Sequence, residues 1–352
     1  MNVLVVNAGS SSLKLSVLGQ DDEVLARHHV EHWDGTPDLD LDLPPVHAVG
    51  HRVVHGGTRF TRPAVITPGV REEITALTDL APLHQPRALA GIDAALRLFP
   101  DLPHVACFDT AFHHTLPPAA ATHPLPAEWR ERWGLQRHGF HGLSHAYASR
   151  HAVQLAGGGT RVVTCHLGAG CSLTAVHHGC SVDTTMGFTP LGGIPMATRP
   201  GDLDPGLLLH LLHHLTPDQL TDGLNHHSGL LGLSGHADLR DLHTAIAAGS
   251  TDAALALDVF THRLRQGIAT MTASMGGLDL LVFTGGIGEH DPELRARVIN
   301  GLAFLGLDLD PHANTAASGD AWIGSGVWVV TAREDVEIAG ETRAALAGGV
   351  AR

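Results

Sequence analysis

Two segments of this chain repeat one pattern, in which a short apolar strand, a turn of glycine and small polar residues, and a second strand follow one another. Residues 3–6 run into Asn7-Ala8-Gly9-Ser10 and then an alternating strand at 13–18. Residues 161–165 run into His166-Leu167-Gly168-Ala169-Gly170 and then a strand at 172–176. With one extra residue in the second copy, the turns align. Such self-similarity is expected of a duplicated unit, although glycine turns also join strands in unrelated folds.

Strand and helix patterns alternate along the remainder of the chain. Strands are predicted at 47–54, 105–108, 280–284 and 327–331, and helices at 86–98, from Asp204-Pro205 to His214, at 252–274, after Asp291-Pro292 and at 341–347. This alternation predicts an α/β fold with mixed central sheets. A length of 352 residues suits about two domains. The Pro/Ala-rich segment 117–126 is a candidate connection between them.

Composition and charge exclude several function classes. Hydrophobic residues make up 43% of the chain and charged residues 16%, which is typical of a globular protein. The net charge of −14 disfavours nucleic acid and anionic membrane surfaces as partners. No apolar run reaches the roughly 18–20 residues of a membrane span, and the four cysteines lack CxxC spacing. These features predict a cytoplasmic protein with reduced thiols.

Three glycine-rich turns are each predicted to follow a strand, at 7–12, 166–172 and 285–288. Backbone N–H groups in such turns form concave sites for phosphate oxygens, so together they predict a nucleotide site. None matches a P-loop or a complete GxGxxG. Lys14, the only lysine of the chain, lies beside the first turn, which suggests a role near phosphate, although chance retention explains it equally.

Charged residues lie at predicted strand ends. Arg52 and Arg199 are in glycine-containing loops and can bind carboxylate or phosphate, although a surface ion pair is the simpler interpretation. Asp109 follows a buried strand, where catalytic or metal-linked carboxylates occur, but it could equally cap the next turn. Glu334 and Asp335 lie beyond the last strand and could bind Mg²⁺ through water or be merely solvated.

The 28 histidines do not form a recognisable zinc site. The segment 138–145 contains three histidines, but its two glycines give no helical histidine face, so zinc is rejected. Most histidines are expected at the surface. Five adjacent pairs should point apart on a helix or strand, namely 28–29, 113–114, 177–178, 213–214 and 226–227.

Taken in order, these motifs resemble the acetokinase family of the actin-like/sugar-kinase ATPase superfamily. The resemblance runs nearly end to end, over 7–14 (NAGSSSLK), 50–57 (GHRVVHGG), 81–84 (APLH), 108–113 (FDTAFH), 139–142 (GFHG), 166–168 (HLG), 183–191 (DTTMGFTPL), 201–205 (GDLDP), 228–235 (SGLLGLSG) and 283–289 (FTGGIGE).

The resemblance implies reversible transfer of the ATP γ-phosphoryl group to acetate, giving acetyl phosphate and ADP, with Mg²⁺ or alternatively Mn²⁺. It implies two duplicated ribonuclease H-like (actin-like ATPase) domains with a cleft between them, comprising residues 1–112 with about 336–352, and residues 113–335, which would hold the nucleotide. It also implies a homodimer.

The resemblance assigns roles to residues at matching positions. The catalytic group would be Arg52, His84, Asp109, His141 and Arg199, and an apolar pocket for the acetate methyl would comprise Val54, Leu83, Phe140 and Pro190. The nucleotide would contact His166, Gly168, Ala169, Gly170, Asp238, Leu239, Arg240, Gly285, Gly286, Ile287 and Gly288. The first phosphate loop would use Asn7, Ser10, Ser12 and Lys14, and the metal would be bound by Asn7 and Glu334. Such groups suit phosphoryl transfer, which depends on positioning and charge neutralisation.

Three departures from the family pattern leave alternatives open. Ala169 replaces a usual Asn, the chain is contracted near 33–45, and the usual Thr-Asn-Glu-Glu reads Thr331-Ala332-Arg333-Glu334. A propionate- or butyrate-type kinase, or a nucleotide-binding relative with a changed phosphoryl donor or no catalysis, therefore stays possible. A histidine-rich metal buffer is a further alternative.

Overall fold

The computed structural model describes residues 1–9, 12–31, 33 and 42–348. The chain forms two compact units, each described by itself. Unit 1 contains residues 1–114, 140–147 and 333–352, and unit 2 contains residues 115–139 and 148–332. Most of the contracted segment near 33–45 lies outside the described residues.

Unit 1 is built on a six-stranded mixed sheet with the order β3-β2-β1-β4-β6-β5. Strands β1, β4 and β6 are parallel, while β2, β3 and β5 are antiparallel to their neighbours. The strands are β1 (Val3–Ala8), β2 (Ser12–Leu18), β3 (Val24–Glu31), β4 (Ala48–Val53), β5 (Ala64–Val65) and β6 (His104–Phe108).

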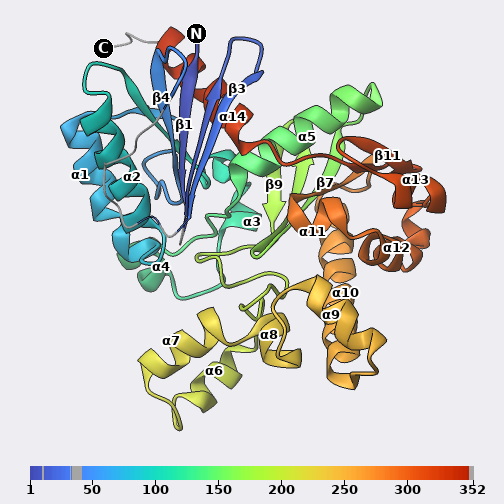
Figure 1. Cartoon of the computed structure of the whole chain (residues 1–352). Coiled ribbons are helices and arrows are strands. Elements are labelled where there is room, and N and C mark those ends of the chain that lie inside the picture. Colours follow the sequence, from blue (N-terminus) through green and yellow to red (C-terminus); the bar gives the residue numbers. More distant parts are fainter. Residues whose placement is uncertain (10–11, 32, 34–41, 349–352) are drawn as a thin grey trace. The chain divides into compact units, whose positions relative to one another are not determined.

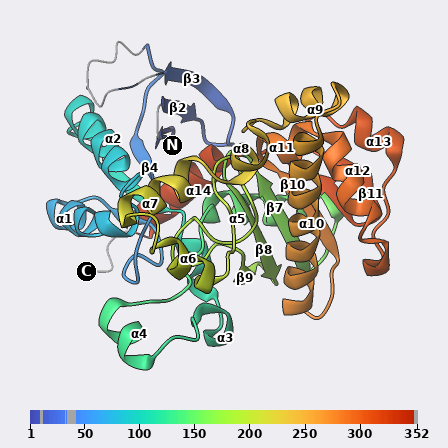
Figure 2. The ribbon, with the colours of Figure 1, turned by 90° about the horizontal axis from the view of Figure 1, so that it is seen from below.

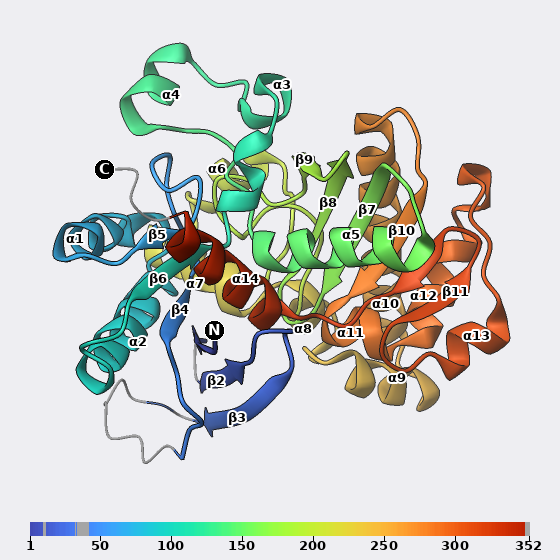
Figure 3. The ribbon, with the colours of Figure 1, turned by 90° about the horizontal axis from the view of Figure 1, so that it is seen from above.

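Alternation along β1 decides which helix covers which face of this sheet. Val3 and Val5 pack with residues of α14 (Glu334–Ala347), whereas Leu4 and Val6 pack with residues of α2 (Gln85–Leu98). In Figures 1 and 3 these two helices lie on opposite faces of the sheet, and α1 (Pro68–Ala76) lies beside α2. The parallel strands are therefore buried on both faces, as parallel strands usually are.

Unit 2 is built on a second six-stranded sheet, with the order β11-β12-β10-β7-β8-β9. The long helix α10 (Thr251–Ser274) lies along one face, as Figure 2 shows, and α5 (Gly142–Ala156), which begins in unit 1, continues across the other face. The strands are β7 (Arg161–Leu167), β8 (Cys171–His177), β9 (Cys180–Thr184), β10 (Leu280–Thr284), β11 (Ala321–Gly324) and β12 (Val327–Val329). The other helices are α3 (Pro118–Ala121), α4 (Ala127–Trp133), α6 (Pro205–Leu211), α7 (Pro217–His226), α8 (Gly229–Ser234), α9 (Leu239–Ala247), α11 (Gly285–His290), α12 (Pro292–Asn300) and α13 (Pro311–Ala316).

The two sheets have the same topology. β7, β8 and β9 pair as β1, β2 and β3 do, and β10, β12 and β11 repeat the positions and directions of β4, β6 and β5. The repeat seen in the sequence is thus the first hairpin of each sheet. The predicted α/β class, with duplicated domains and mixed central sheets, is confirmed.

Several predictions of local structure were wrong. Residues 285–288 begin helix α11 instead of forming a free turn, α6 ends at Leu211 and not at His214, and α14 begins at Glu334 and not near 341. The rings of His177 and His178 do not point apart: their centroids are 4.4 Å from each other, because His178 lies in a turn with φ of 50°. Most described histidines are exposed or partly exposed, as expected, and six are buried, at 51, 55, 104, 113, 138 and 145.

The boundaries expected for the duplicated domains stay a prediction. The two compact units are defined by contacts between residues, and such contacts do not show which segments were duplicated. The Pro/Ala-rich segment 117–126 contains α3 and belongs to unit 2. Among the described residues, no helix combines the length and the apolar character needed to cross a membrane.

Candidate active site

The carboxyl ends of the parallel strands in unit 1 bring together Asn7, Arg52, Asp109 and Glu334. Arg52 Nη2 lies 2.7 Å from Asp109 Oδ2, and Arg52 Nε lies 3.1 Å from Oδ1. Arg52 Nη1 lies 3.3 Å from Glu334 Oε2. Arg52 Nη1 also donates to Asn7 Oδ1 at 3.4 Å, and Asn7 Nδ2 donates to Glu334 Oε2 at 3.4 Å. Four residues far apart in the sequence therefore form one hydrogen-bonded cluster, which we call the Arg52 cluster.

Burial and mutual attraction have opposite effects on the pKa values of Arg52 and Asp109 in the Arg52 cluster. The Asp109 side chain is 2% exposed and that of Arg52 is 21% exposed. Burial alone would lower the pKa of the Arg52 guanidinium, but the charges of Asp109 and Glu334 outweigh it and raise this pKa above its ordinary value. Burial raises the pKa of the Asp109 carboxyl, and the charge of Arg52 opposes that rise. Asp109 is thus an ion-pair partner of Arg52.

The Arg52 cluster carries donors suited to Mg²⁺. Two carboxylates and the Asn7 amide oxygen are the hard oxygen ligands that Mg²⁺ takes, usually together with substrate phosphates. All three residues contact the one guanidinium of Arg52. No group of three or more His, Cys, Asp and Glu side chains suited to a metal occurs in the described ranges. The residues therefore fit a Mg²⁺ ion whose remaining ligands come from water or phosphate.

The residues predicted to form the first phosphate loop lie around the turn between β1 and β2, close to Asn7 of the Arg52 cluster. Lys14 is exposed and lies directly opposite Asn7 in the antiparallel pair of β1 and β2, so both side chains leave the same face. Ser12 begins β2. The predicted residue Ser10 lies outside the described residues.

Phe140 and His141 immediately precede α5. Phe140 is buried, whereas His141 is half-buried. The N–H of Gly142 donates to the carbonyl oxygen of Asp109 at 2.8 Å, which ties this segment to the end of β6. A Cβ on residue 142 would lie 2.2 Å from that oxygen, so only glycine fits there. The backbone directly after His141 is therefore bonded to Asp109, a member of the Arg52 cluster.

The other residues predicted to contact acetate are spread through unit 1. Val54 follows β4 and is half-buried, and His84 is half-buried at the start of α2. Leu83 is 48% exposed. Unit 1 by itself therefore does not enclose Leu83 in an apolar pocket, and its predicted contact with acetate stays a prediction.

In unit 2, the turn at 168–170 joins β7 to β8. Gly168 N–H donates to Gly170 O at 3.0 Å, and the carbonyl of the exposed Ala169 accepts from Ala197 N–H at 3.3 Å. His166, half-buried at the end of β7, occupies the position that Asn7 has in β1. The Ala169 side chain has room for a larger residue, because it is exposed.

Arg199 is half-buried and donates from Nη1 to the carbonyl of Pro190 at 3.0 Å. Within the described part of the chain, it forms no ion pair with a carboxylate. Burial lowers the pKa of Arg199 below its ordinary value. A half-buried guanidinium held by one carbonyl keeps donors for an anionic group. The structure thus places Arg199 with Pro190, another predicted site residue.

The remaining predicted nucleotide residues lie at two helix starts of unit 2. Asp238 caps α9 and forms an ion pair with Arg240, whose side chain is 90% exposed. Hydrogen bonds from Arg240 lower the pKa of Asp238 to about 2. Leu239, between them, is buried. Gly285 has φ of 79° and leaves no room for a Cβ, which would lie 2.7 Å from Leu167 O. A Cβ on Gly286 would meet nothing within 4 Å, so there is open space at this position in the first turn of α11, which also contains Ile287 and Gly288.

Two further residues hold the predicted site together and were not predicted. Glu289 Oε1 accepts from Gly285 N–H at 3.0 Å and from Ala332 N–H at 2.9 Å. His113 Nε2 lies 3.0 Å from Phe140 O. Both residues occur in the quoted motifs, but their partners lie elsewhere in the sequence, so spacing carries no signal for these roles.

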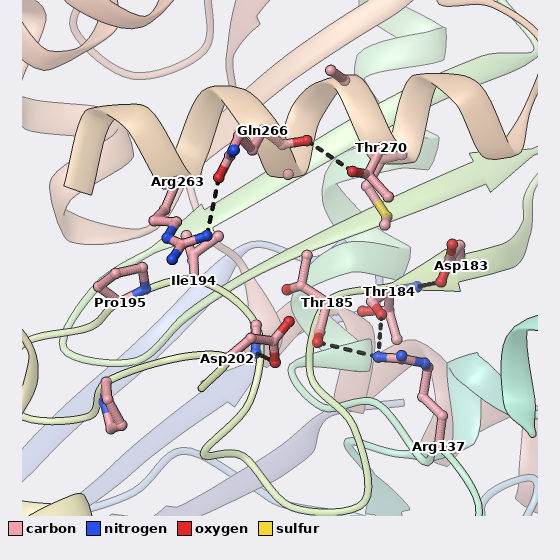
Figure 4. Close-up of a pocket in the computed structure, with 15 residues that line it drawn as sticks. Arg137, Asp183, Thr184, Thr185, Ile194, Pro195, Asp202, Arg263, Gln266 and Thr270 are labelled. Carbon is pink, nitrogen blue, oxygen red and sulfur yellow. Dashed lines mark hydrogen bonds between the residues drawn. The ribbon is translucent and has the colours of Figure 1, made fainter. Parts of the chain in front are cut away.

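Unit 2 has a cavity that the sequence did not predict. It has a volume of about 530 Å³ and lies between α10 and the segments 183–185 and 193–202. Figure 4 shows Arg137 and Arg263 at opposite sides of it. Arg137 Nη1 donates to the carbonyls of Thr184, Thr185 and Met186. None of the residues assigned above to the substrates lines this cavity, although Pro200, which follows Arg199, does.

The two sheets share one topology, and polar and charged residues lie at the carboxyl ends of their parallel strands. A model of the acetokinase family matches residues 36–339. The chain is 44% identical to the acetate kinase of Leifsonia xyli subsp. xyli (strain CTCB07), over 99% of each sequence. It therefore belongs to the acetokinase family.

Solved structures agree with this assignment. The acetate kinase of Porphyromonas gingivalis superposes with a TM-score of 0.89 at 35% identity, over 98% of this chain and 99% of that one. A propionate kinase from Francisella tularensis subsp. tularensis SCHU S4 superposes with a TM-score of 0.90 at 34% identity, over 97% and 99%.

Proposed function

We propose that this protein is an acetate kinase, which transfers the γ-phosphoryl group of ATP reversibly to acetate and yields acetyl phosphate and ADP. The observation that carries the proposal is the Arg52 cluster, in a member of the acetokinase family: a cation held between Asp109, at the end of a parallel strand, and Glu334, at the start of α14. We further propose a cytoplasmic homodimer, on the basis of the family resemblance.

Each charged group has a role in this reaction. Arg52 binds the acetate carboxylate, because a guanidinium and a carboxylate match in two parallel hydrogen bonds. Arg199 and His141 donate to the oxygens of the transferred phosphoryl group, and the carboxylate of acetate needs no strong base to attack. Asn7, Asp109 and Glu334 would hold Mg²⁺. When bound, Mg²⁺ neutralises charge on the phosphate oxygens.

Nucleotide binding is assigned to unit 2. The glycine-rich turn at 168–170 suits phosphate, and the space at Gly286 suits adenosine. Pairing Asp238 with Arg240 leaves both side chains partly exposed, and therefore accessible to a nucleotide.

Propionate is a second candidate acceptor. The Francisella structure that matches this chain is a propionate kinase. One methylene in an apolar pocket changes specificity only by roughly 10- to 200-fold. Both acids are therefore expected to react, with acetate preferred.

The experiment is a hydroxamate assay of acyl phosphate formation by the full chain. It crosses acetate, propionate and butyrate with ATP, GTP and pyrophosphate, with and without EDTA. We expect the highest kcat/KM for acetate with ATP and loss of activity with EDTA that Mg²⁺ or Mn²⁺ restores. No acyl phosphate from any pair would refute the proposal, and a preference for butyrate or pyrophosphate would replace it. Light scattering after gel filtration tests the dimer.

A further inference from the structure

His141 has a backbone conformation that a histidine rarely adopts. Its φ is 57°, in the left-handed region, which among the described non-glycine residues is shared only by Asp22 and His178. Its carbonyl accepts the first bond of α5, from His145 N–H at 3.0 Å, so His141 is the N-cap of that helix. N-caps usually have extended conformations. A conformation of this kind persists only where neighbouring contacts enforce it.

Two hydrogen bonds enforce it, one on each side of His141. Before it, the carbonyl of Phe140 lies 3.0 Å from Nε2 of His113. A carbonyl oxygen can only accept, so Nε2 of His113 carries the proton and donates. After it, the N–H of Gly142 donates to Asp109 O at 2.8 Å. The peptide groups on both sides of His141 are therefore fixed to the segment 109–113.

His113 is itself firmly held. It is 2% exposed, and its backbone N–H donates to Thr110 O at 3.2 Å. Its ring meets the rings of Phe112 and His145 edge-on, with centroids 5.6 Å and 5.9 Å away. A buried side chain whose ring is packed on two sides is suited to holding another group in place.

The side chain of Phe140 has a separate support. Its ring packs edge-on against the ring of His55, with centroids 5.6 Å apart. Loss of the bond from His113 therefore frees the backbone before His141 without removing the packing of the Phe140 ring. This separates an effect on His141 from an effect on the proposed acetate pocket.

We propose that His113 is a positioning residue for His141. By donating to the Phe140 carbonyl, it holds His141 in the left-handed conformation and thereby fixes the direction of the His141 imidazole relative to Asp109 and Arg52. The inference rests on the proposed function, in which His141 donates to the transferred phosphoryl group. His113 does not contact substrate in this scheme.

The test uses two variants that lack the donor, His113→Leu and the polar, shorter His113→Asn, and one that keeps it. Gln places its amide nitrogen where Nε2 of histidine lies, so His113→Gln is the matched control. We expect the donor-lacking variants to reduce kcat roughly 10- to 100-fold, with the KM values for acetate and ATP within about threefold of wild type. His113→Gln should recover most of kcat.

The same substitutions are then made in His141→Ala. If His113 acts through His141, the residual kcat of this variant does not fall further. An equal loss in both backgrounds, a His113→Gln variant no better than His113→Leu, or a rise in KM without loss of kcat would overturn the proposal. Circular dichroism and gel filtration establish that each variant is folded. If neither donor-lacking variant folds, His113 is a residue of the core and the proposal is wrong.

A readout independent of activity separates this inference from the proposed function. The NMR signals of the His141 imidazole, assigned by their loss in His141→Ala, should shift in His113→Asn and stay in place in His113→Gln. If wild type forms no acyl phosphate, the proposed function fails, while these signals still report on positioning. Unchanged signals in an active enzyme would refute the positioning role alone.

Discussion

Arg52→Ala should destabilise unit 1, and adding Asp109→Asn should restore most of the loss. Arg52 donates to both oxygens of Asp109, at 2.7 and 3.1 Å, and Asp109 is 2% exposed. Removal of one partner from a buried pair leaves an uncompensated charge, which costs about 3–5 kcal/mol. Neutralising Asp109 in the same chain removes that charge. Substrate affinity does not return, so the acetate KM stays raised in the double variant.

The assay is urea unfolding at pH 7.5, followed by intrinsic fluorescence, to which Trp33 contributes from the core of unit 1. With an m-value of about 3 kcal/mol per M, the single variant should lower the midpoint by roughly 1–2 M. Arg71→Ala is the matched control. Its two-pronged pair with Asp93, at 2.6 and 2.7 Å, is more exposed, with side chains 37% and 30% accessible.

A pair as exposed as this one is worth about 0.2–1 kcal/mol, and Arg71→Ala should leave the acetate KM unchanged. The reasoning fails if Arg52→Ala costs no more stability than Arg71→Ala. It also fails if Asp109→Asn adds to the loss in the Arg52→Ala chain instead of reversing it.

Two further predictions concern the second phosphate turn and acid stability. Ala169→Asn should raise kcat/KM for ATP about 10- to 100-fold with the acetate KM unchanged, because a charge-assisted hydrogen bond is worth about 1.5–3 kcal/mol; slower ATP kinetics would mean that the turn has adapted to alanine. Burial, and to a smaller extent the charge of His123, lowers the pKa of His138 to about 4 from its ordinary value of 6.5. Between these pH values the unfolded chain binds a proton at His138 that the folded chain does not, so the free energy of unfolding falls as the pH drops from 7 toward 4. Between pH 7.5 and pH 5, His138 should account for about 2 kcal/mol of the wild-type loss in the free energy of unfolding, as measured from urea midpoints. A His138→Gln variant with the same pH dependence as wild type would contradict this contribution.

The sequence was sufficient for the parallel strands and for the individual charged residues near their ends, whereas β3, β5, β9 and β11 were not predicted. Apolar runs ended by glycine and polar residues predicted β1, β4, β6 and β10 to within a few residues. Each member of the Arg52 cluster was also singled out by its position. Their mutual pairing was not predicted, because it depends on the order of β1, β4 and β6 in the sheet, which no local pattern encodes.

Two errors have identifiable physical causes. Gly285 to Gly288 predicted a turn because glycine is a poor helix former, but Glu289 accepts from Gly285 N–H and Leu167 packs against it, so tertiary contacts impose the helix. The early start of α14 had an unused signal. Acidic residues favour the first turn of a helix, and Glu334 and Asp335 lie in the first turn of α14.

The order of the chain through the two units sets an order for folding during synthesis. The sheet of unit 1 is complete by residue 108, but Val336, Ile338 and Ala339 of α14 cover one of its faces. Residues 115–332 are made in between, which takes on the order of 10–40 s at roughly 5–20 residues per second. During that time unit 2 can fold, whereas the face of β1 that packs against α14 stays partly uncovered. Until α14 is made, nascent unit 1 therefore lacks both Glu334 and the α14 residues that complete the cover of this face.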